Sequence, residues 1–384
     1  MKNFCRGKIL VAAYIGMLLF GIAFLSLGTV STFLQAKFSL SPSSTASLAS
    51  SLPFGMLAGT LLFGPVADRF GYKYLLVIPA LLIVLAMELL ARAQALWVLQ
   101  VSFFLIGAGG GALNGATNAL VADVTEENKG AELSLLGVFF GIGALGMPAL
   151  MGILTKTIAY ETVISATGWI LLLPAIFFML TAFPDPKQKQ GFPVGKGLAL
   201  LREPLLIIAG LILFFESGLE GMVSNWTTTF LANRNISADK ALFALSVQVV
   251  ALVVARLMLS RLLRKFPPLS VLFLCLLLLG AGSLLIYFGA GYGIALVSLV
   301  LFGVGFAAGF PVVLGIIGER YPTLSGTAFG MVIMMALIGN TLLNYLTGIV
   351  SQAWGIGFFP LLLTICVVIM VGILLVLKRG TSKK

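Results

Sequence analysis

Long apolar runs recur along this whole chain and limit what it can fold into. Residues 269–288 and 359–377 are two examples, and neither contains a charged side chain. A helix needs about 20 apolar residues to cross a bilayer, at a rise of about 1.5 Å per residue. The runs do not alternate between apolar and polar residues, which excludes the strands of a membrane barrel. The sequence therefore predicts an all-α membrane protein.

The composition supports a bilayer as the main solvent of this chain. Of its 384 residues, 60% are hydrophobic and 10% are charged, whereas a soluble domain carries about 25% charged residues. Histidine is absent, and Cys5, Cys275 and Cys366 have no partner nearby in sequence, so we expect neither a metal site nor a disulfide. No nucleophile–base pair is recognisable, and we expect neither an enzyme nor a cofactor.

Breaks at glycine, proline and charged residues divide the chain into twelve predicted spans. A long connector at 184–203 separates a first bundle of six helices, residues 1–183, from a second, residues 204–384. The predicted spans lie near residues 9–34, 43–66, 73–92, 96–122, 132–155, 162–183, 204–231, 240–263, 267–288, 292–318, 325–350 and 353–377.

The positions of the basic residues predict the orientation. With a cytoplasmic N-terminus, 18 of the 24 Lys and Arg residues fall on the cytoplasmic side, 5 fall on the other side, and Arg256 lies within a span. Cytoplasmic segments carry the excess of basic residues in membrane proteins. We therefore expect an inner-membrane protein with both termini in the cytoplasm. This pattern also explains the net charge of +11 without nucleic-acid binding.

The two halves of the chain are related in sequence. At an offset of 196, Gly143 aligns with Gly339, and an offset of 197 sets Gly21 on Gly218. Further pairs are Gly107/Gly303, Gly109/Gly305, Gly130/Gly326, Gly152/Gly348, Asp123/Glu319 and Phe33/Phe230. Two parallel repeats of six spans are typical of transporters that rock about a central site, and matched small residues let helices approach closely.

A ten-residue motif, residues 64–73, lies between predicted spans 2 and 3. It resembles the loop signature of the major facilitator superfamily, which implies two six-helix bundles around a solute site. Glycine permits close contact, the carboxylate can meet a helix N-terminus, and the basic residues suit an anionic leaflet. We interpret the motif as a conformational latch, with 261–265 as its degenerate second copy. The latch residues are Gly64, Asp68, Arg69, Gly71 and Lys73.

Residues 218–226, Arg256 and residues 303–311 are similar to the fucose permease and glucose/galactose transporter branch of that superfamily. The resemblance implies sugar binding and proton coupling by acids in spans 1 and 4. Here span 1 has no carboxylate, and Asn114 takes the place of the acid in span 4. Gly137 and Phe140 replace the amide residues of span 5. We therefore expect a different solute, or coupling that has moved to the second half.

Charged residues inside a membrane are rare and usually functional. Glu216 and Glu220 lie one turn apart on one face of predicted span 7, and Arg256 lies in span 8. These three residues are the candidate coupling residues, with a proton or a sodium ion as the partner. The alternative is structural: Arg256 could bridge to Glu216 and hold the two spans together.

Polar side chains within the spans are the candidates for contacting the solute. Amide groups offer paired donors and acceptors to hydroxyl groups, and an indole offers a flat face to a sugar ring. The alternatives are hydrogen bonds between helices and an aromatic residue at the membrane interface. The candidate substrate-binding residues are Asn114, Asn118, Glu220, Asn225, Trp226, Gln248 and Asn344.

The leading hypothesis is a secondary transporter that moves a sugar or similar polar solute by alternating access. A drug or metabolite exporter of the same fold is the alternative, because residues 143–152 partly resemble the antiporter signature of exporters. A small solute and the lipid bilayer are the expected partners, and a monomer suffices.

Overall fold

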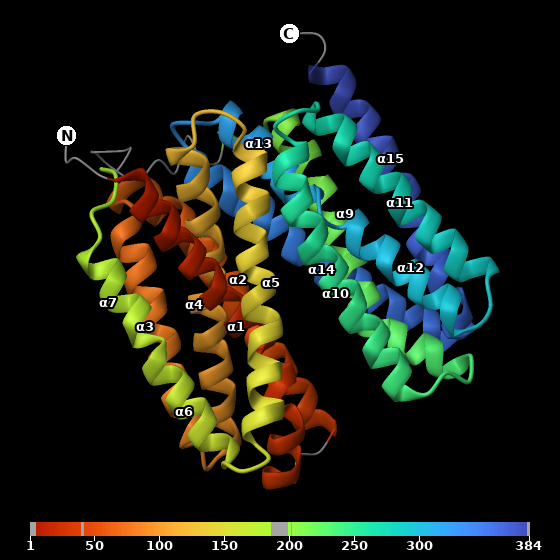
Figure 1. Ribbon diagram of the computed structural model, residues 1–384, viewed down its shortest axis with the longest axis horizontal. Helices are drawn as coiled ribbons and strands as arrows, with labels where there is room; N and C mark the ends of the chain where they lie inside the picture. Colours follow the sequence, from red (N-terminus) through yellow and green to blue (C-terminus); the bar gives the residue numbers. More distant parts are fainter. Residues whose placement is uncertain (1–4, 40–41, 186–198, 201, 382–384) are drawn as a thin grey trace. The chain divides into compact units, whose positions relative to one another are not determined.

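The computed structural model describes residues 5–39, 42–185, 199–200 and 202–381, and every element in these ranges is helical (Figure 1). Most of the predicted connector, 184–203, lies outside the described residues. The first half contains α1 (Arg6–Phe38), α2 (Pro42–Phe70), α3 (Tyr72–Ala91), α4 (Leu96–Val124), α5 (Lys129–Leu154), α6 (Tyr160–Ile170) and α7 (Leu172–Leu180). The second half contains α9 (Pro204–Asn233), α10 (Ala238–Leu262), α11 (Pro268–Phe288), α12 (Tyr292–Gly305), α13 (Gly309–Arg320), α14 (Ser325–Trp354), the short helix η1 (Ile356–Phe358) and α15 (Phe359–Thr381).

Within the described part of the chain, eleven helical stretches are long and apolar enough to cross a membrane, and α2 adds a shorter apolar stretch, Ser50–Gly64. The helices follow the order of the twelve predicted spans. The prediction of an all-α membrane protein is therefore confirmed.

Two predicted spans are divided into two helices each. Span 6 divides at Leu171 into α6 and α7, and span 10 divides at residues 306–308 into α12 and α13. In both cases a proline is the third residue of the second helix, Pro174 in α7 and Pro311 in α13. Proline lacks an N–H and clashes with the carbonyl four residues earlier, which is where each helix ends or turns.

The motif at 64–73 is not the loop that its sequence suggested. Helix α2 continues to Phe70 and α3 begins at Tyr72, so that Gly71 alone joins them. Gly71 has a φ of 76°, a left-handed conformation that favours glycine. The prediction of a loop between the spans was wrong because the polar residues of the motif extend α2 instead of ending it.

The helices form two compact units. Unit 1 comprises Met1–Val124, Phe139–Gly197 and the start of α14, Tyr321–Gly330. Unit 2 comprises the start of α5, Thr125–Val138, then Leu198–Arg320 and Met331–Lys384. Each unit thus includes the first turns of one long helix whose remainder belongs to the other unit.

The glycines matched by the internal repeat lie at equivalent helix crossings. In unit 1, a Cβ added to Gly143 of α5 would lie 2.2 Å from the carbonyl oxygen of Leu18 in α1. In unit 2, a Cβ added to Gly339 of α14 would lie 2.1 Å from the carbonyl oxygen of Phe214 in α9. Only glycine allows backbones to approach this closely. The sequence repeat is therefore also a repeat of helix packing.

Candidate functional site

Glu216 of α9 is the most deeply buried acid among the described side chains of unit 2. Its side chain is 1% exposed, and neither carboxylate oxygen has a hydrogen-bond partner among the described residues. It packs against Gly309, the first residue of α13: a Cβ added there would lie 1.6 Å from Oε2. The carboxylate thus occupies space that any other residue at 309 would fill.

Arg256 of α10 is 6% exposed and binds the start of α5. Its Nη1 donates a hydrogen bond of 3.2 Å to the carbonyl oxygen of Gly137, and Ser134 Oγ donates one of 2.8 Å to the carbonyl oxygen of Arg256. A Cβ on Gly137 would lie 2.7 Å from Nη1. The absence of a side chain at Gly137, which the sequence comparison treated as a lost amide, makes room for the guanidinium group.

The bridge between Arg256 and Glu216, which was the structural alternative, does not form. The guanidinium group of Arg256 binds a backbone carbonyl instead, and its Nε has no hydrogen-bond partner among the described residues. Glu216 and Glu220 nevertheless lie within electrostatic range of Arg256. Glu220 is half-buried one turn along α9, whereas Glu216 is fully enclosed.

A ladder of amide side chains joins α9 to α14. Asn340 Nδ2 donates to the carbonyl oxygen of Ser217 at 2.8 Å, and Asn344 Nδ2 donates to the carbonyl oxygen of Asn340 at 2.7 Å. At the end of the ladder, Asn225 Nδ2 donates to Asn344 Oδ1 at 3.0 Å, and Asn225 is exposed. The sequence analysis noted Asn225 and Asn344 separately, and the structure brings them together.

Two further candidates of unit 2 lie beside glycines. The ring of half-buried Trp226 lies next to Gly348 of α14, where an added Cβ would be 3.4 Å from Cζ2. Gln248 of α10 is 2% exposed, and its backbone carbonyl oxygen lies 2.3 Å from a Cβ added to Gly303 of α12. Gln248 therefore lies at a tight helix crossing.

The candidate amides of unit 1 bond to each other within α4. Asn118 is 6% exposed, and its Nδ2 donates to the carbonyl oxygen of Asn114 at 2.8 Å and to Asn114 Oδ1 at 3.0 Å. Asn114 is half-buried. These bonds orient both amides on one face of the helix.

The predicted latch residue Asp68 caps the start of α14. Asp68 is 1% exposed, and it accepts hydrogen bonds from the N–H of Gly326 at 3.3 Å and the N–H of Thr327 at 3.0 Å. Thr327 Oγ1 also donates to Asp68. A Cβ on Gly64 would lie 2.8 Å from the carbonyl oxygen of Gly326. Gly64 thus gives the close approach that the motif predicted.

A second carboxylate, Asp123 of α4, lies at the same helix start. Ser325 Oγ donates to Asp123 Oδ1 at 2.8 Å, and the Tyr72 hydroxyl donates to Asp123 Oδ2. The basic residues of the motif lie nearer the surface: Arg69 is half-buried with its guanidinium group 5.1 Å from the Phe70 ring centre, and Lys73 is exposed. Carboxylates at a helix N-terminus stabilise the unpaired N–H groups and the helix dipole.

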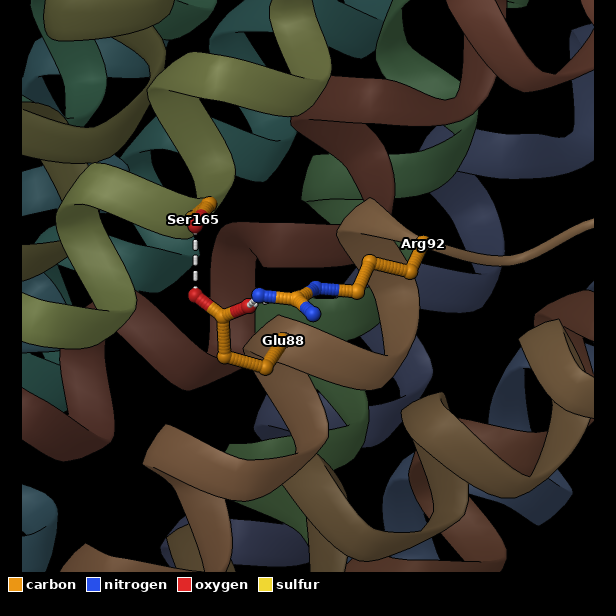
Figure 2. A network of polar contacts seen from close by, with 3 residues as sticks. All are labelled: Glu88, Arg92 and Ser165. Carbon is orange, nitrogen blue, oxygen red and sulfur yellow. Dashed lines mark hydrogen bonds and ion pairs between the residues drawn. The ribbon is translucent and has the colours of Figure 1, made fainter.

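Glu88 of α3 serves as a contrast to Glu216. Figure 2 shows its carboxylate between Arg92 and Ser165. Arg92 Nη2 lies 3.0 Å from Glu88 Oε2, and Ser165 Oγ donates to Glu88 Oε1. Both oxygens of Glu88 are therefore paired, whereas both oxygens of Glu216 are not.

Comparison with known proteins agrees with this architecture. The family model described as "Major Facilitator Superfamily" matches residues 13–268 and 211–384, which together span most of the chain. The chain belongs to the Major Facilitator Superfamily. As a member of that superfamily, it has the two-bundle transporter fold that the motif at 64–73 predicted.

The glucose/mannose transporter GlcP of Bacillus subtilis is similar along nearly the whole length, with 23% identity over 394 residues that cover 94% of this chain and 93% of GlcP. Multidrug resistance protein MdtG of Salmonella arizonae is 31% identical over 151 residues, 38% of this chain and 37% of MdtG. Several curated matches are partial, and the chain spans only 47%, 36% and 37% of the length of three such relatives.

Among solved structures, the fucose:proton symporter FucP of E. coli, in the outward conformation, has a TM-score of 0.83 to this superfamily member. Sequence identity is 20%, and the match covers 96% of this chain and 98% of FucP. The resemblance in fold to the fucose permease branch is confirmed. At this identity the match establishes the fold and leaves the solute open.

Proposed function

We propose that this superfamily member is a secondary active transporter that moves a small polar solute, with a sugar as the leading candidate, by alternating access. The observation that carries the proposal is the amide ladder of unit 2, which ends in the exposed Asn225 bonded to Asn344. Amide groups pair with hydroxyl groups as both donors and acceptors. Trp226, one residue further along α9, adds a flat face for a sugar ring. A similar protein over its whole length, GlcP, is a glucose/mannose transporter.

Asn114 and Asn118 are the proposed solute contacts of the first bundle, and Glu220 and Gln248 complete those of the second. The bundles, residues 1–183 and 204–384, are proposed to move as bodies joined by the connector 184–203. A monomer suffices for this mechanism. The excess of Lys and Arg on one side supports an inner-membrane protein with both termini in the cytoplasm.

Coupling to an ion is proposed to depend on Glu216, Glu220 and Arg256. The leading candidate for this ion is a proton, and the second candidate is sodium. A carboxylate inside a membrane is the usual carrier of a transported proton. The similar fold of FucP, a fucose:proton symporter, supports the same energy source.

The latch around Asp68 is proposed to break and re-form during the transport cycle. Its hydrogen bonds hold the first turn of α14, whose remainder belongs to unit 2. Gly64, Arg69, Gly71 and Lys73 shape and anchor this contact. Because Asp68 binds backbone N–H groups, the bonds can re-form with the same partners in every cycle.

An efflux antiporter for drugs or metabolites is the second candidate. The partial similarity to multidrug resistance protein MdtG and the glycine-rich stretch 143–152 support it. The polar ladder of unit 2 suits a hydroxylated solute better than a lipophilic one, which places this function second.

The test is uptake by the purified protein in liposomes. A panel of labelled hexoses, pentoses and deoxyhexoses is offered with and without a pH gradient, and lipophilic cations are offered from the inside. We expect uptake and mutual competition among some of the sugars. Extrusion of lipophilic cations without any sugar uptake or competition would replace the proposal with the exporter function.

A further inference from the structure

The division of the tenth span creates a helix N-terminus inside the apolar part of unit 2. Pro311 lacks an N–H, and its ring excludes a regular helix at Ala307, so α12 ends at Gly305 and α13 begins at Gly309. Helix α13 has 12 residues, and its first unpaired N–H groups lie at its start. An interrupted helix of this kind points its N-terminus at an anionic group in many transporters.

The group at this N-terminus is the carboxylate of Glu216. Glu216 is 1% exposed, and neither oxygen has a hydrogen-bond partner among the described residues. Gly309 is packed directly against it, and the Gly309 N–H is close enough to influence the carboxylate without a hydrogen bond of normal geometry. An ionised carboxylate buried without hydrogen bonds is strongly unfavourable, whereas the neutral acid is tolerated.

The charged and titratable groups around Glu216 come from three helices. Glu220 lies on α9, Arg256 on α10 and Cys275 on α11, and all three lie within electrostatic range of Glu216. Helix α14 contains no charged residue, and the charged residues of α13 and α15 lie in their last turns. Arg256 is the nearby cation, and its Nη1 is bonded to Gly137.

We infer that Glu216 is the proton-binding site of the transport cycle, with the joint between α12 and α13 controlling its charge. In the conformation described here, Glu216 carries a proton on its carboxyl group and is therefore neutral. When the joint moves so that the N–H groups of Gly309 and Phe310 bond to the carboxylate, the ionised form is stabilised and the O–H bond breaks, giving the proton to water. Before α13 can pack against Glu216 again, the carboxylate must take up a proton from water.

This inference rests on the proton coupling proposed above, and it names Glu216 rather than Glu220 as the acid that exchanges the proton. Infrared difference spectroscopy tests it without a known solute. The protein in lipid is titrated over a wide pH range, and the carbonyl stretch of protonated carboxylic acids is followed in H₂O and D₂O. The variants are Glu216→Gln, Glu216→Asp and Glu220→Gln, with Glu88→Gln as the control, because Glu88 is paired with Arg92.

We expect a carbonyl band that titrates in the wild type, disappears in Glu216→Gln, shifts in Glu216→Asp and survives in Glu220→Gln and Glu88→Gln. Because glutamine imitates the neutral acid, Glu216→Gln should fold with the thermal stability of the wild type. A band that persists in Glu216→Gln, or a Glu216 band that does not change at any pH, would overturn the inference. Failure of all sugar uptake alongside the expected band would reject the sugar but leave the proton site intact.

Discussion

The two halves of this superfamily member share the same helix crossings but differ in the residues that they bury. The matched residues Gly143 and Gly339 mark the same close helix crossing in each half. The halves differ in their buried residues. The position of Glu216 in the second half corresponds, at the offset of 197, to the buried Leu19 in the first. The divided pair α12 and α13 likewise corresponds to the unbroken α4.

The comparison separates the residues that build the fold from those that carry its chemistry. A duplicated bundle needs the same helix crossings twice, so the glycines at those crossings match. Buried charge and an interrupted helix are unfavourable for folding, and in the second half they adjoin each other where Glu216 packs against Gly309 at the start of α13. This contrast supports the proposal that the coupling residues lie in the second half, and the absence of the acids expected in spans 1 and 4 fits the same proposal.

Substitution of Gly309 should have the largest effect on stability, because it overfills the site where the halves differ most. In Gly309→Ala the new Cβ would lie 1.6 Å from Glu216 Oε2, so the carboxylate or α13 must shift. We expect a loss of about 1–3 kcal/mol, seen as a lower Tm in detergent.

Gly146→Ala is the matched control, because no atom lies within 4 Å of a Cβ at that position of α5. Its Tm should stay near that of the wild type. The double variant Gly309→Ala/Glu216→Ala should recover part of the loss, since it removes the overlapping carboxylate. Additive losses in the double variant would contradict the packing described here.

The two copies of the latch should differ in strength. Asp68 corresponds, at the offset of 196, to Arg264, whose Nη2 lies 2.9 Å from Glu132 Oε1 at the start of α5. Asp68 is buried and caps a helix, so Asp68→Ala should lower stability by about 1–2 kcal/mol. The Arg264 side chain is 55% exposed, and Arg264→Ala should lower stability by less than about 1 kcal/mol.

Thermal unfolding of both variants, together with their transport rates, checks this order. Asp68→Ala should slow transport as well, because the proposed latch re-forms in each cycle. Equal losses for Asp68→Ala and Arg264→Ala would show that the second copy of the motif is not degenerate.

The smallest effects are expected at the C-terminal ends of α1 and α9, where the two halves are again similar. Lys37 and Arg234 occupy matching positions: Lys37 Nζ lies 2.9 Å from Glu161 Oε1, and Arg234 Nη1 donates to the carbonyl oxygen of Gly289 at 2.6 Å. The hydrogen bond to Glu161 raises the pKa of Lys37 above its ordinary value of 10.5.

Because the pKa of Lys37 is raised in the folded state, its stabilising effect is complete below pH 10.5 and is lost as the pH rises through the raised value. Lys37→Gln should therefore lower Tm slightly at neutral pH, by the equivalent of less than about 1 kcal/mol, and not at all in strongly alkaline solution. Arg234→Gln should lower Tm by the same amount at both pH values. A difference between Lys37→Gln and the wild type that persists in alkali would exclude the ion pair as the cause.

Much of the fold was predictable because its signals are local. Long apolar runs marked the spans, and the motif at 64–73 marked the family. The divisions of spans 6 and 10 were not predicted, because Pro79 and Pro148 lie inside the unbroken helices α3 and α5. Proline alone does not decide whether a helix breaks, since neighbouring helices can satisfy or replace the lost hydrogen bond.

The partners of the candidate residues were harder to predict than the residues themselves. Opposite charge suggested that Arg256 would bridge to Glu216, but the space left by Gly137, 119 residues away in sequence, decides where the guanidinium group lies. The motif correctly suggested a helix N-terminus for Asp68, yet nothing local identified the start of α14 as the helix that Asp68 would cap. Contacts between distant parts of the chain depend on shape, which a single sequence does not display.

The central claim is that Glu216 of the second half couples proton movement to solute transport. The most direct test measures proton movement driven by the solute. Liposomes containing the protein are suspended in weakly buffered medium, a transported sugar is added, and the external pH is recorded. The wild type should make the medium more alkaline, whereas Glu216→Gln should show no pH change while still exchanging labelled for unlabelled sugar. Alkalinisation of normal size in Glu216→Gln would contradict the account.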